Sequence, residues 1–531
     1  MYYLYVGLAL VSLLIVLTKR QRCAAPARRH GLRLPPAPWQ LPLIGSLHHI
    51  AGQLPHRAMR DLARRHGPVM LLRIGEVPMV VVSSREGARE VMKAHDLAFA
   101  SRPLSAALRV LVDGGRDIIF APYGEHWRQL RKICAVELLS ARRVLSFRAV
   151  REDEVAAALR SCAADAAAAA DARSAVVDMH ARLSALVADA TVRAVVGDRF
   201  ERRDVFLRAL DRAVELAAGF NPADLWPSSR LVGRLSGVIR RAEECHDAVF
   251  GIIDGIVEEH QERMVVGGGV GKDEDVVDVL LRLQKDAGLQ FPLDLDIIKA
   301  VIFDMVSAGS ETSATTLEWA MAEFVRNPKA MARATAEVRG AFAAHGAVPE
   351  HALGELRYLH LVIRETLRLH PPAPLLLPRE CREPCRVLGY DVPRGTTVIV
   401  NVWALGHDER YWPDDPEEFR PERFEAEAGG VVQGRRLRAP AVRRRTEDVP
   451  RDGVRARQRR ARARQPAVPL RLGGARRGRP GRARHGRGVR HHRAKEGRPP
   501  PPPHPPRARA RCLVAVPAAP TDCSSLRSCS G

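Results

Sequence analysis

The 531-residue sequence has no cysteine between Cys385 and Cys512, and none of its nine cysteines forms a Cys-x-x-Cys pair. Scattered cysteines in an odd number argue against a disulfide framework and favour a reducing compartment. No aromatic residue follows Phe424, and no isoleucine, methionine or asparagine occurs from Gly434 onward. A segment so poor in apolar residues cannot bury a core of its own. The Gly-rich stretch 264–271 lacks the Lys-Ser/Thr ending of a phosphate-binding loop.

Charge is unevenly distributed between the body and the tail of the chain. Residues 434–531 contain 28 Lys and Arg against five Asp and Glu, whereas residues 1–433 contain 56 of each sign. The sequence pI of 10.5 therefore describes the Arg-rich tail and not the body. Such a tail could bind RNA, DNA or anionic lipid, but it has no aromatic side chain to stack on bases. We expect no specific nucleic-acid partner.

The N-terminal part of the sequence predicts a membrane anchor. Residues 1–18 are uncharged and apolar, near the lower length limit of a spanning helix, and basic residues follow them. A cleaved signal peptide would carry its positive charge first, and charge placed after the apolar run keeps the body in the cytoplasm. Residues 19–45 are basic and then Pro-rich, which predicts an extended strap or linker.

Residues 46–427 read as a mainly α-helical body with a small β region. Residues 71–75 and 78–82 predict two short strands around a turn, and 378–380 and 396–401 predict further β segments. Most of the sequence from Ser84 to about Lys329 has helical periodicity.

The sequence 303–313, Phe-Asp-Met-Val-Ser-Ala-Gly-Ser-Glu-Thr-Ser, interrupts a long apolar helix predicted from Leu295 to Arg326. Mid-helix glycine costs about 1 kcal/mol relative to alanine, and a buried threonine hydroxyl needs a partner. The helix therefore either allows a group to approach its backbone or packs a glycine against a neighbour, with the threonine bonded to its own turn. Residues 327–328, Asn-Pro, end the helix.

Three shorter motifs carry charge. Trp127 and Arg131 share a helix face, either as two donors for a carboxylate or as an exposed cation–π pair. Glu365 and Arg368 lie three residues apart on an apolar helix and require a further partner if they face inward. Arg423, in Pro-Glu-Arg-Phe, is the candidate partner.

The anchor, the strap and the four motifs, in this order, resemble a plant-type microsomal cytochrome P-450 over residues 1–427. The resemblance implies a mainly α-helical fold with a small β region, incomplete at the C-terminus, and haem b as the cofactor. It also implies a monooxygenase that acts on a lipophilic small molecule, such as a terpenoid, with O₂ and electrons from an NADPH-dependent reductase. The location implied is the endoplasmic reticulum membrane.

The resemblance also implies roles for individual residues. Thr312, helped by Glu311, would hold a water and deliver protons for oxygen activation. Ala308 and Gly309 would let the helix pass close over the haem. The haem propionates would be bound by Trp127, Arg131 and Arg379. A structural charge network beneath the haem would consist of Glu365, Arg368 and Arg423.

The iron ligand expected of this family is missing. A cysteine thiolate should follow Pro-Glu-Arg-Phe by a few tens of residues, in a loop Phe-x-x-Gly-x-Arg-x-Cys-x-Gly. Read one base later, with free third bases, residues 436–440 can encode Asp-Phe-Glu-Leu-Leu and residues 441–452 can encode Pro-Phe-Gly-Ala-Gly-Arg-Arg-Thr-Cys-Pro-Gly. We therefore predict a frameshift between about Phe424 and Arg435 and an aberrant, disordered tail over 434–531.

Two alternatives to an active monooxygenase remain open from the sequence. The chain as written could be a non-catalytic, degenerate family member, because no cysteine stands at the ligand position and thiolate ligation of a metal is not possible there. A basic tail that binds nucleic acid or an anionic surface is the weaker alternative. Neither the substrate nor the position of its oxidation can be read from the sequence.

Overall fold

The computed structural model describes residues 31–168, 177–197, 200, 202–218, 220–266, 274–286, 288–342 and 349–425. The predicted anchor 1–18, the strap up to residue 30 and the tail 434–531 lie outside the described residues. Within the described ranges, no helix is both long and apolar enough to cross a membrane. The described chain is mainly helical with a small β region, as the sequence predicts.

The helices and helical turns are η1 (Leu47–His49), α2 (Pro55–His66), α3 (Arg85–Arg89), η2 (Glu90–Ala94), α4 (Ala106–Leu111), α5 (Glu125–Ile133), η3 (Cys134–Leu138), α6 (Ala141–Ser146), α7 (Arg148–Ala168), α8 (Met179–Val196), α9 (Arg203–Ala217), α10 (Pro222–Leu225), α11 (Arg230–Leu235), α12 (Val238–Val266), α13 (Val276–Gln284), α14 (Leu295–Arg326), α15 (Pro328–Phe342), η4 (Glu350–Glu355), α16 (Arg357–Leu369), α17 (Val402–Gly406) and η5 (Pro421–Phe424). The strands are β1 (Val69–Ile74), β2 (Val77–Val82), β3 (Arg379–Glu380), β4 (Cys385–Val387), β5 (Tyr390–Val392) and β6 (Thr397–Val400).

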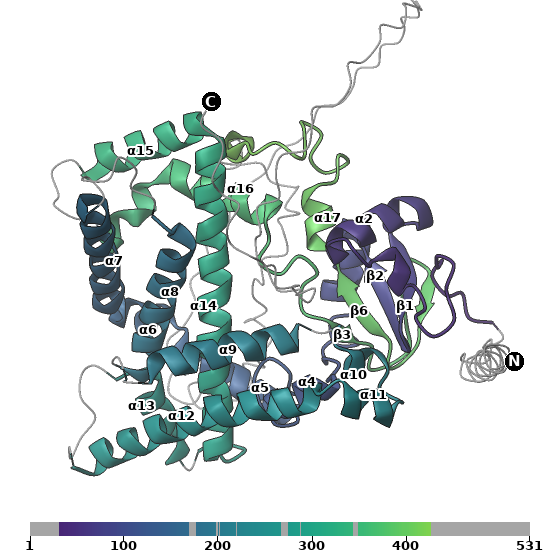
Figure 1. The fold of residues 1–531 in the computed structure, drawn as a ribbon, viewed down its shortest axis with the longest axis horizontal. Helices are drawn as coiled ribbons and strands as arrows, with labels where there is room; N and C mark the ends of the chain where they lie inside the picture. The colour runs from purple at the N-terminus through teal and green to yellow at the C-terminus, as the bar shows by residue number, and fades with distance from the viewer. Residues whose placement is uncertain are drawn as a thin grey trace, which may run out of the picture. The chain divides into compact units, whose positions relative to one another are not determined.

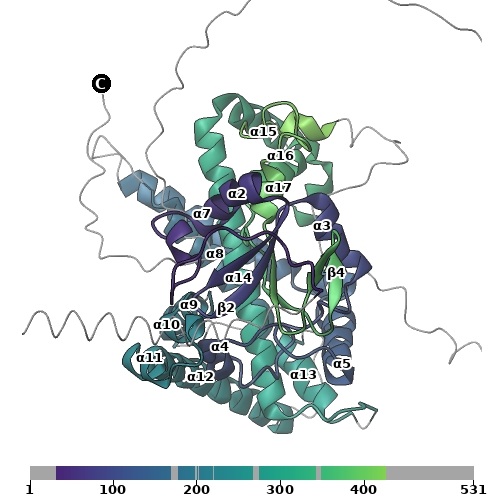
Figure 2. The same ribbon diagram turned by 90° about the vertical axis from the view of Figure 1, so that its right-hand side faces the viewer.

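A four-stranded sheet has the order β1-β2-β6-β3. β1 and β2 form the predicted antiparallel hairpin, and β6, from more than 300 residues later, adds parallel to β2 with Val80 opposite Val398. β3 pairs antiparallel with β6, which places Arg379 opposite Val398. α2 and α17 lie side by side beyond one end of this sheet (Figure 2). Valine and isoleucine dominate the central strands because β-branched side chains suit a pleated, buried surface.

Helix α14 runs through the helical part of the body and has the bounds that the sequence predicts (Figure 1). Asp294 caps its N-terminus by accepting a hydrogen bond from the Ile297 N–H, and Asn327 ends it before Pro328. α14 packs most extensively against α8. Its first half buries Ile298, Val301 and neighbouring residues in the largest hydrophobic core of the described chain.

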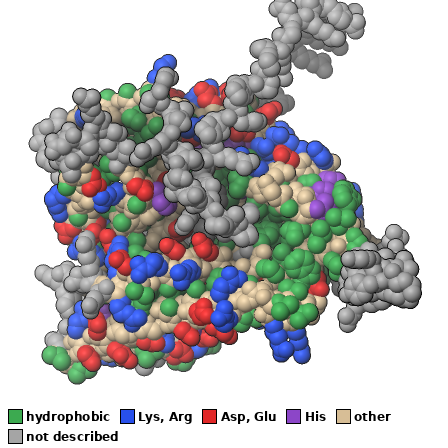
Figure 3. All heavy atoms as spheres, in the orientation of Figure 1, with side chains coloured by type: hydrophobic (Ala, Val, Ile, Leu, Met, Phe, Trp, Pro, Cys, Tyr) green, Lys and Arg blue, Asp and Glu red, His purple; other side chains and the backbone are tan. Residues whose placement is uncertain are grey.

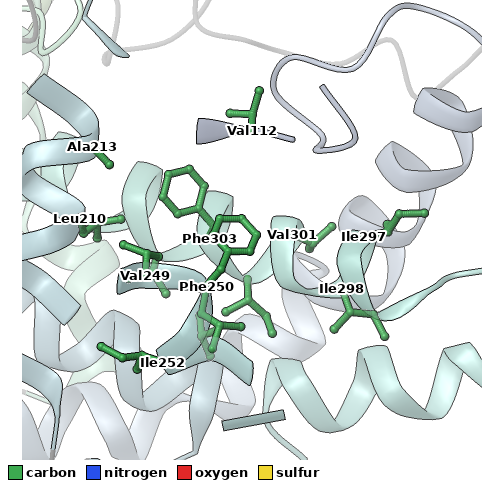
Figure 4. Close-up of a cluster of buried hydrophobic side chains, with 14 of the residues drawn as sticks. Val112, Leu210, Ala213, Val249, Phe250, Ile252, Ile297, Ile298, Val301 and Phe303 are labelled. Carbon is green, nitrogen blue, oxygen red and sulfur yellow. The ribbon is translucent and has the colours of Figure 1, made fainter. Parts of the chain in front are cut away.

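That core joins α14 to α4, α8, α9, α12 and α13. Phe303 of α14 packs against Phe250 of α12 with 5.8 Å between ring centroids, and Val249 and Leu210 lie beside them (Figure 4). Burial of each such side chain contributes about 1.5–3 kcal/mol, so the first half of α14 is held rigidly. Most strand ends differ from the predicted ones by one or two residues, and Met264 to Val266, the first residues of the Gly-rich stretch, belong to α12.

Candidate functional site

A cavity of about 1210 Å³ lies against the middle of α14. Its walls come from α4, α9, α10, α11, α12, α14, β6 and residues 373–378. Most of its lining is apolar, including Leu104, Leu111, Phe120, Phe220, Leu375 and Ile399. A cavity of this size and character accommodates a lipophilic small molecule.

One face of α14 contributes polar side chains to the cavity wall. Asp304, Ala308, Glu311 and Thr312 recur at helical spacing and all line the cavity. Ala308 is exposed to the cavity although Val306 and Ala314, on either side, are buried. The small Ala308 side chain therefore leaves the backbone of α14 accessible to a ligand.

Thr312 of α14 lines the cavity, whereas Gly309 of α14 faces helix α8. The Thr312 hydroxyl donates to the Ala308 carbonyl one turn earlier, at 2.8 Å, so its oxygen keeps lone pairs for a ligand or a water. A Cβ added to Gly309 would lie 3.2 Å from the Thr191 Cγ2 of α8. The motif was expected either to open the helix backbone to a ligand or to pack against a neighbouring helix. Ala308 faces the cavity, whereas Gly309 lets α14 and α8 approach closely.

Arg379, predicted from the sequence, lies beside Arg102, which no sequence motif had singled out. Arg379 Nη1 donates to the Phe99 carbonyl, and Arg102 Nη1 donates to the carbonyls of Leu377 and Pro378. Burial and the neighbouring Arg379 charge lower the pKa of Arg102 to about 10, and burial lowers the pKa of Arg379. Within the described chain neither guanidinium forms an ion pair, so the two together can bind a dianionic group.

Trp127 and Arg131 lie on α5, as predicted, but not as a free pair of donors. Trp127 Nε1 donates to the Ile118 carbonyl at 3.0 Å, and the Arg131 guanidinium lies over the Trp127 ring at 5.1 Å. This is the cation–π alternative, and it differs from the donor-pair expectation because a nearer backbone acceptor satisfies the indole N–H. The Arg131 side chain remains exposed.

Glu365, Arg368 and Arg423 come together in a buried network. Arg368 binds Glu365 through two hydrogen bonds of 2.7 Å, and Arg423 Nε donates to Glu365 Oε1 at 2.8 Å. The three side chains are 0%, 2% and 6% exposed, respectively. Carbonyls of residues 406 and 414–418 accept the remaining guanidinium protons. The network therefore fastens residues 414–423 onto α16.

Two buried carboxyl groups, Asp117 and Asp304, were missed by the sequence reading. Asp304 Oδ2 accepts hydrogen bonds from the N–H groups of Ile118 and Ile119, and Asp117 Oδ1 accepts from the Phe120 N–H. Burial raises the pKa of Asp117 to about 6 and, together with the Asp117 charge, raises the pKa of Asp304 well above its usual value. Asp304 could have been noticed as an acidic residue on an apolar helix face. Its partner Asp117 could not have been inferred, because it lies far away in the sequence.

The described residues fit only part of a haem site. Ala308 opens the helix face toward the cavity, and Arg102 with Arg379 suits two propionates. The iron ligand is not among the described residues, because none of the described cysteines lines the cavity. These cysteines are Cys134, Cys162, Cys245, Cys381 and Cys385. Cys381 and Cys385 instead contact each other, Sγ to Sγ, at 4.0 Å beside the smaller sheet.

Comparison with known proteins identifies the family. The family model of cytochrome P-450 matches residues 35–439. The chain belongs to the cytochrome P-450 family. It is 48% identical over 423 residues to zealexin A1 synthase of Zea mays, covering 79% of this chain and 82% of that protein. It is 47% identical to premnaspirodiene oxygenase of Hyoscyamus muticus, covering 74% and 77% of the two chains.

Solved cytochrome P-450 structures have the same fold. A zebrafish cytochrome P-450 determined with progesterone aligns with a TM-score of 0.58 at 26% identity, over 70% of this chain and 84% of that one. Membership makes the chain a monooxygenase by family, with haem iron, O₂, a reductase as redox partner and a lipophilic substrate as the family requirements. The α14 residues Ala308, Glu311 and Thr312 line the cavity, and Arg102 donates hydrogen bonds to the carbonyls of its lining residues Leu377 and Pro378.

Proposed function

We propose that the body of this chain belongs to a plant monooxygenase that inserts one oxygen atom of O₂ into a C–H bond of a terpenoid. The observation that carries the proposal is the apolar 1210 Å³ cavity closed on one side by Ala308, Glu311 and Thr312. Relatives named dolabradiene monooxygenase and ent-isokaurene C2/C3-hydroxylase, both 47% identical, support the terpenoid class. An apolar hydrocarbon gains binding energy from such walls without needing polar anchors.

The chain's own residues have distinct tasks in this proposal. Thr312 accepts a hydrogen bond from a water while donating to Ala308, and Glu311 exchanges protons with that water. Arg102 and Arg379 would bind the two propionates, which would relieve the repulsion between the guanidinium groups. When bound, haem b supplies the iron that activates dioxygen. The described cysteines do not line the cavity, and no cysteine stands at the expected ligand position in the sequence, so we propose that the chain as written holds no thiolate-ligated haem.

We further propose that a frameshift separates this sequence from an active enzyme. The family match ends at residue 439, and the next reading frame of residues 441–452 can encode the ligand loop with its cysteine. Sequencing the genomic locus and its transcript around Gly434 tests this. A TGC codon in the next frame across residues 449–450 is expected, and its absence would refute the proposal.

Expression of two forms tests the activity. The chain as written is expected to give no reduced-CO band of the thiolate type, whereas the frame-restored chain gives one. The restored protein, with an NADPH-dependent reductase, should oxidise sesquiterpene or diterpene hydrocarbons. A restored protein that gives the thiolate-type band but turns over none of these hydrocarbons would refute the substrate class and leave the family chemistry intact.

Membrane attachment to the endoplasmic reticulum is part of the proposal. Residues 1–18 supply the anchor, and exposed apolar side chains support a second contact: Trp39 and Leu41 in the strap, and Leu231 and Leu235 of α11. Hydrophobic side chains gather around the sheet and α10 on the face seen in Figure 3. Deletion of residues 1–30 should weaken sedimentation with membranes, and Leu231→Ser with Leu235→Ser should weaken it further. Unchanged sedimentation of the combined variant would oppose this.

A further inference from the structure

Asp117 and Asp304 meet where the segment 117–120 crosses α14. Asp304 binds two backbone N–H groups of this segment, at 3.0 and 3.3 Å, and Asp117 binds a third at 3.0 Å. The Ile118 carbonyl is held in turn by Trp127 Nε1 at 3.0 Å. Ile119 and Phe120 of the same segment line the cavity. The carboxyl pair therefore sets where one wall of the cavity stands.

One oxygen of each carboxyl group lacks an ordinary hydrogen-bond donor. These oxygens are Asp117 Oδ2 and Asp304 Oδ1, both fully buried. Asp117 and Asp304 are 0% and 3% exposed, and the charge of Asp117 helps to raise the pKa of Asp304. Two ionised carboxylates placed this way would repel each other in a medium that solvates neither. A proton between the two oxygens satisfies both.

Among the described residues, no basic side chain forms an ion pair with Asp117 or Asp304. Cys134 of η3 is a titratable neighbour of Asp304. Burial and the Asp304 charge raise the pKa of the Cys134 thiol to about 12, so the thiol remains neutral. Arg116, next to Asp117 in the chain, is paired with Asp294 and Asp296 instead. His126 of α5 contacts the Arg116 carbonyl and not the acid pair.

We propose that Asp117 and Asp304 hold one proton between them, and that this acid pair positions the segment 117–120 as a wall of the substrate cavity. The two are positioning residues that act through Ile119 and Phe120. The position of the segment does not depend on catalysis. Only the identification of the cavity as the substrate cavity rests on the proposed function.

The pH dependence follows from the direction of the pKa shifts. Both carboxyl groups have a pKa above the value of about 3.9 for aspartate in an unfolded chain, so protonation of the pair stabilises the folded segment. The pair loses its first proton near the pKa of Asp117, about 6, and keeps the second because the pKa of Asp304 lies well above its usual value. Its stabilising effect is therefore full at acid pH and is lost as pH rises through the higher pKa.

Hydrogen exchange of the full-length protein tests the proposal without any turnover. We would measure protection factors for the Ile118, Ile119 and Phe120 amides, corrected for the intrinsic exchange rate, from slightly acid to alkaline pH. The wild type should lose protection about tenfold for each unit of pH between about 6 and the higher pKa, and its protection should level off above the higher pKa. Asp117→Asn places a permanent N–H donor opposite Asp304, so its protection should stay constant with pH. Asp117→Ala should be poorly protected throughout.

Two further measurements keep the test decisive. The control Asp113→Asn changes an exposed aspartate of the same region, 54% exposed, and should follow the wild type. The infrared C=O band of a protonated carboxyl group should be present in the wild type at neutral pH and absent in Asp117→Asn. The proposal of a shared proton would be overturned by any of three results. The wild-type protection factors do not change with pH, those of Asp117→Asn fall with pH as the wild type does, or the wild type shows no protonated-carboxyl band at neutral pH. If Asp117→Ala does not fold, the comparison of wild type with Asp117→Asn still decides.

Discussion

Gly309 of α14 faces Thr191 of α8, so the glycine in the middle of the central helix is where two helices pack and not where the cavity begins. The cavity is reached one residue earlier, at Ala308. Successive helical residues point about 100° apart, so adjacent small residues can serve two different neighbours. The stability cost of a mid-helix glycine is thus offset by closer contact between α14 and α8.

This contact predicts coupling between Gly309 and Thr191. Gly309→Ala gains about 1 kcal/mol in helix propensity, but its Cβ meets the Thr191 methyl carbon at 3.2 Å, which offsets the gain. Thr191→Ser removes that methyl group, so Gly309→Ala in this background should stabilise the protein by close to the full ~1 kcal/mol. Urea unfolding of the four proteins in this cycle measures the coupling. Additive free energies of unfolding would mean that the two residues do not touch.

The Glu365 network predicts a large loss of stability when its one acid is neutralised. Glu365→Gln leaves the buried Arg368 and Arg423 guanidinium groups without a counter-charge and should cost about 3–5 kcal/mol. The matched control is Arg333→Gln, which breaks exposed pairs with Glu422 and Glu425 and should cost at most about 1 kcal/mol. Denaturant unfolding measures both changes, and equal losses would show that burial does not decide the effect.

The Arg102–Arg379 pair predicts opposite effects with and without haem. In the chain as written, Arg102→Gln removes a repelling charge and should leave the free energy of unfolding unchanged or slightly higher. In the frame-restored protein the same change should lower the haem retained per protein, because one propionate loses a charged donor worth about 1.5–3 kcal/mol. Gel filtration followed by haem quantification measures retention. Equal retention by Arg102→Gln and the wild type would place the propionates elsewhere.

Loss of the Thr312 hydroxyl should lower the rate of product formation much more than the rate of NADPH consumption. In the frame-restored protein, Thr312→Ala should lower the product formed per NADPH by about 10²-fold, the usual contribution of a positioned proton donor. NADPH consumption should fall much less, since electron delivery does not need the hydroxyl. Thr312→Ser keeps the hydroxyl and serves as the control. A proportional fall of both rates in Thr312→Ala would indicate damage to binding or folding instead.

Local patterns in the sequence predicted a large part of this fold. The bounds of α14 and the β1–β2 hairpin follow from caps, proline positions and alternation, all of which act within a few residues. Arg423 was correctly expected near Glu365 because an inward-facing ion pair requires a further partner. Arg102 was not found, since no nearby motif marks an arginine that tertiary packing brings beside Arg379.

The sequence by itself determined the bounds of α14, the β1–β2 hairpin, the cytochrome P-450 order of motifs, and the absence of a cysteine between residues 385 and 512. Only the tertiary structure decided that Trp127 bonds to the Ile118 carbonyl, that Gly309 serves α8, and that Asp304 meets Asp117. The physical reason is that periodicity and capping are local, whereas a buried polar group takes whichever partner the packed chain brings to it.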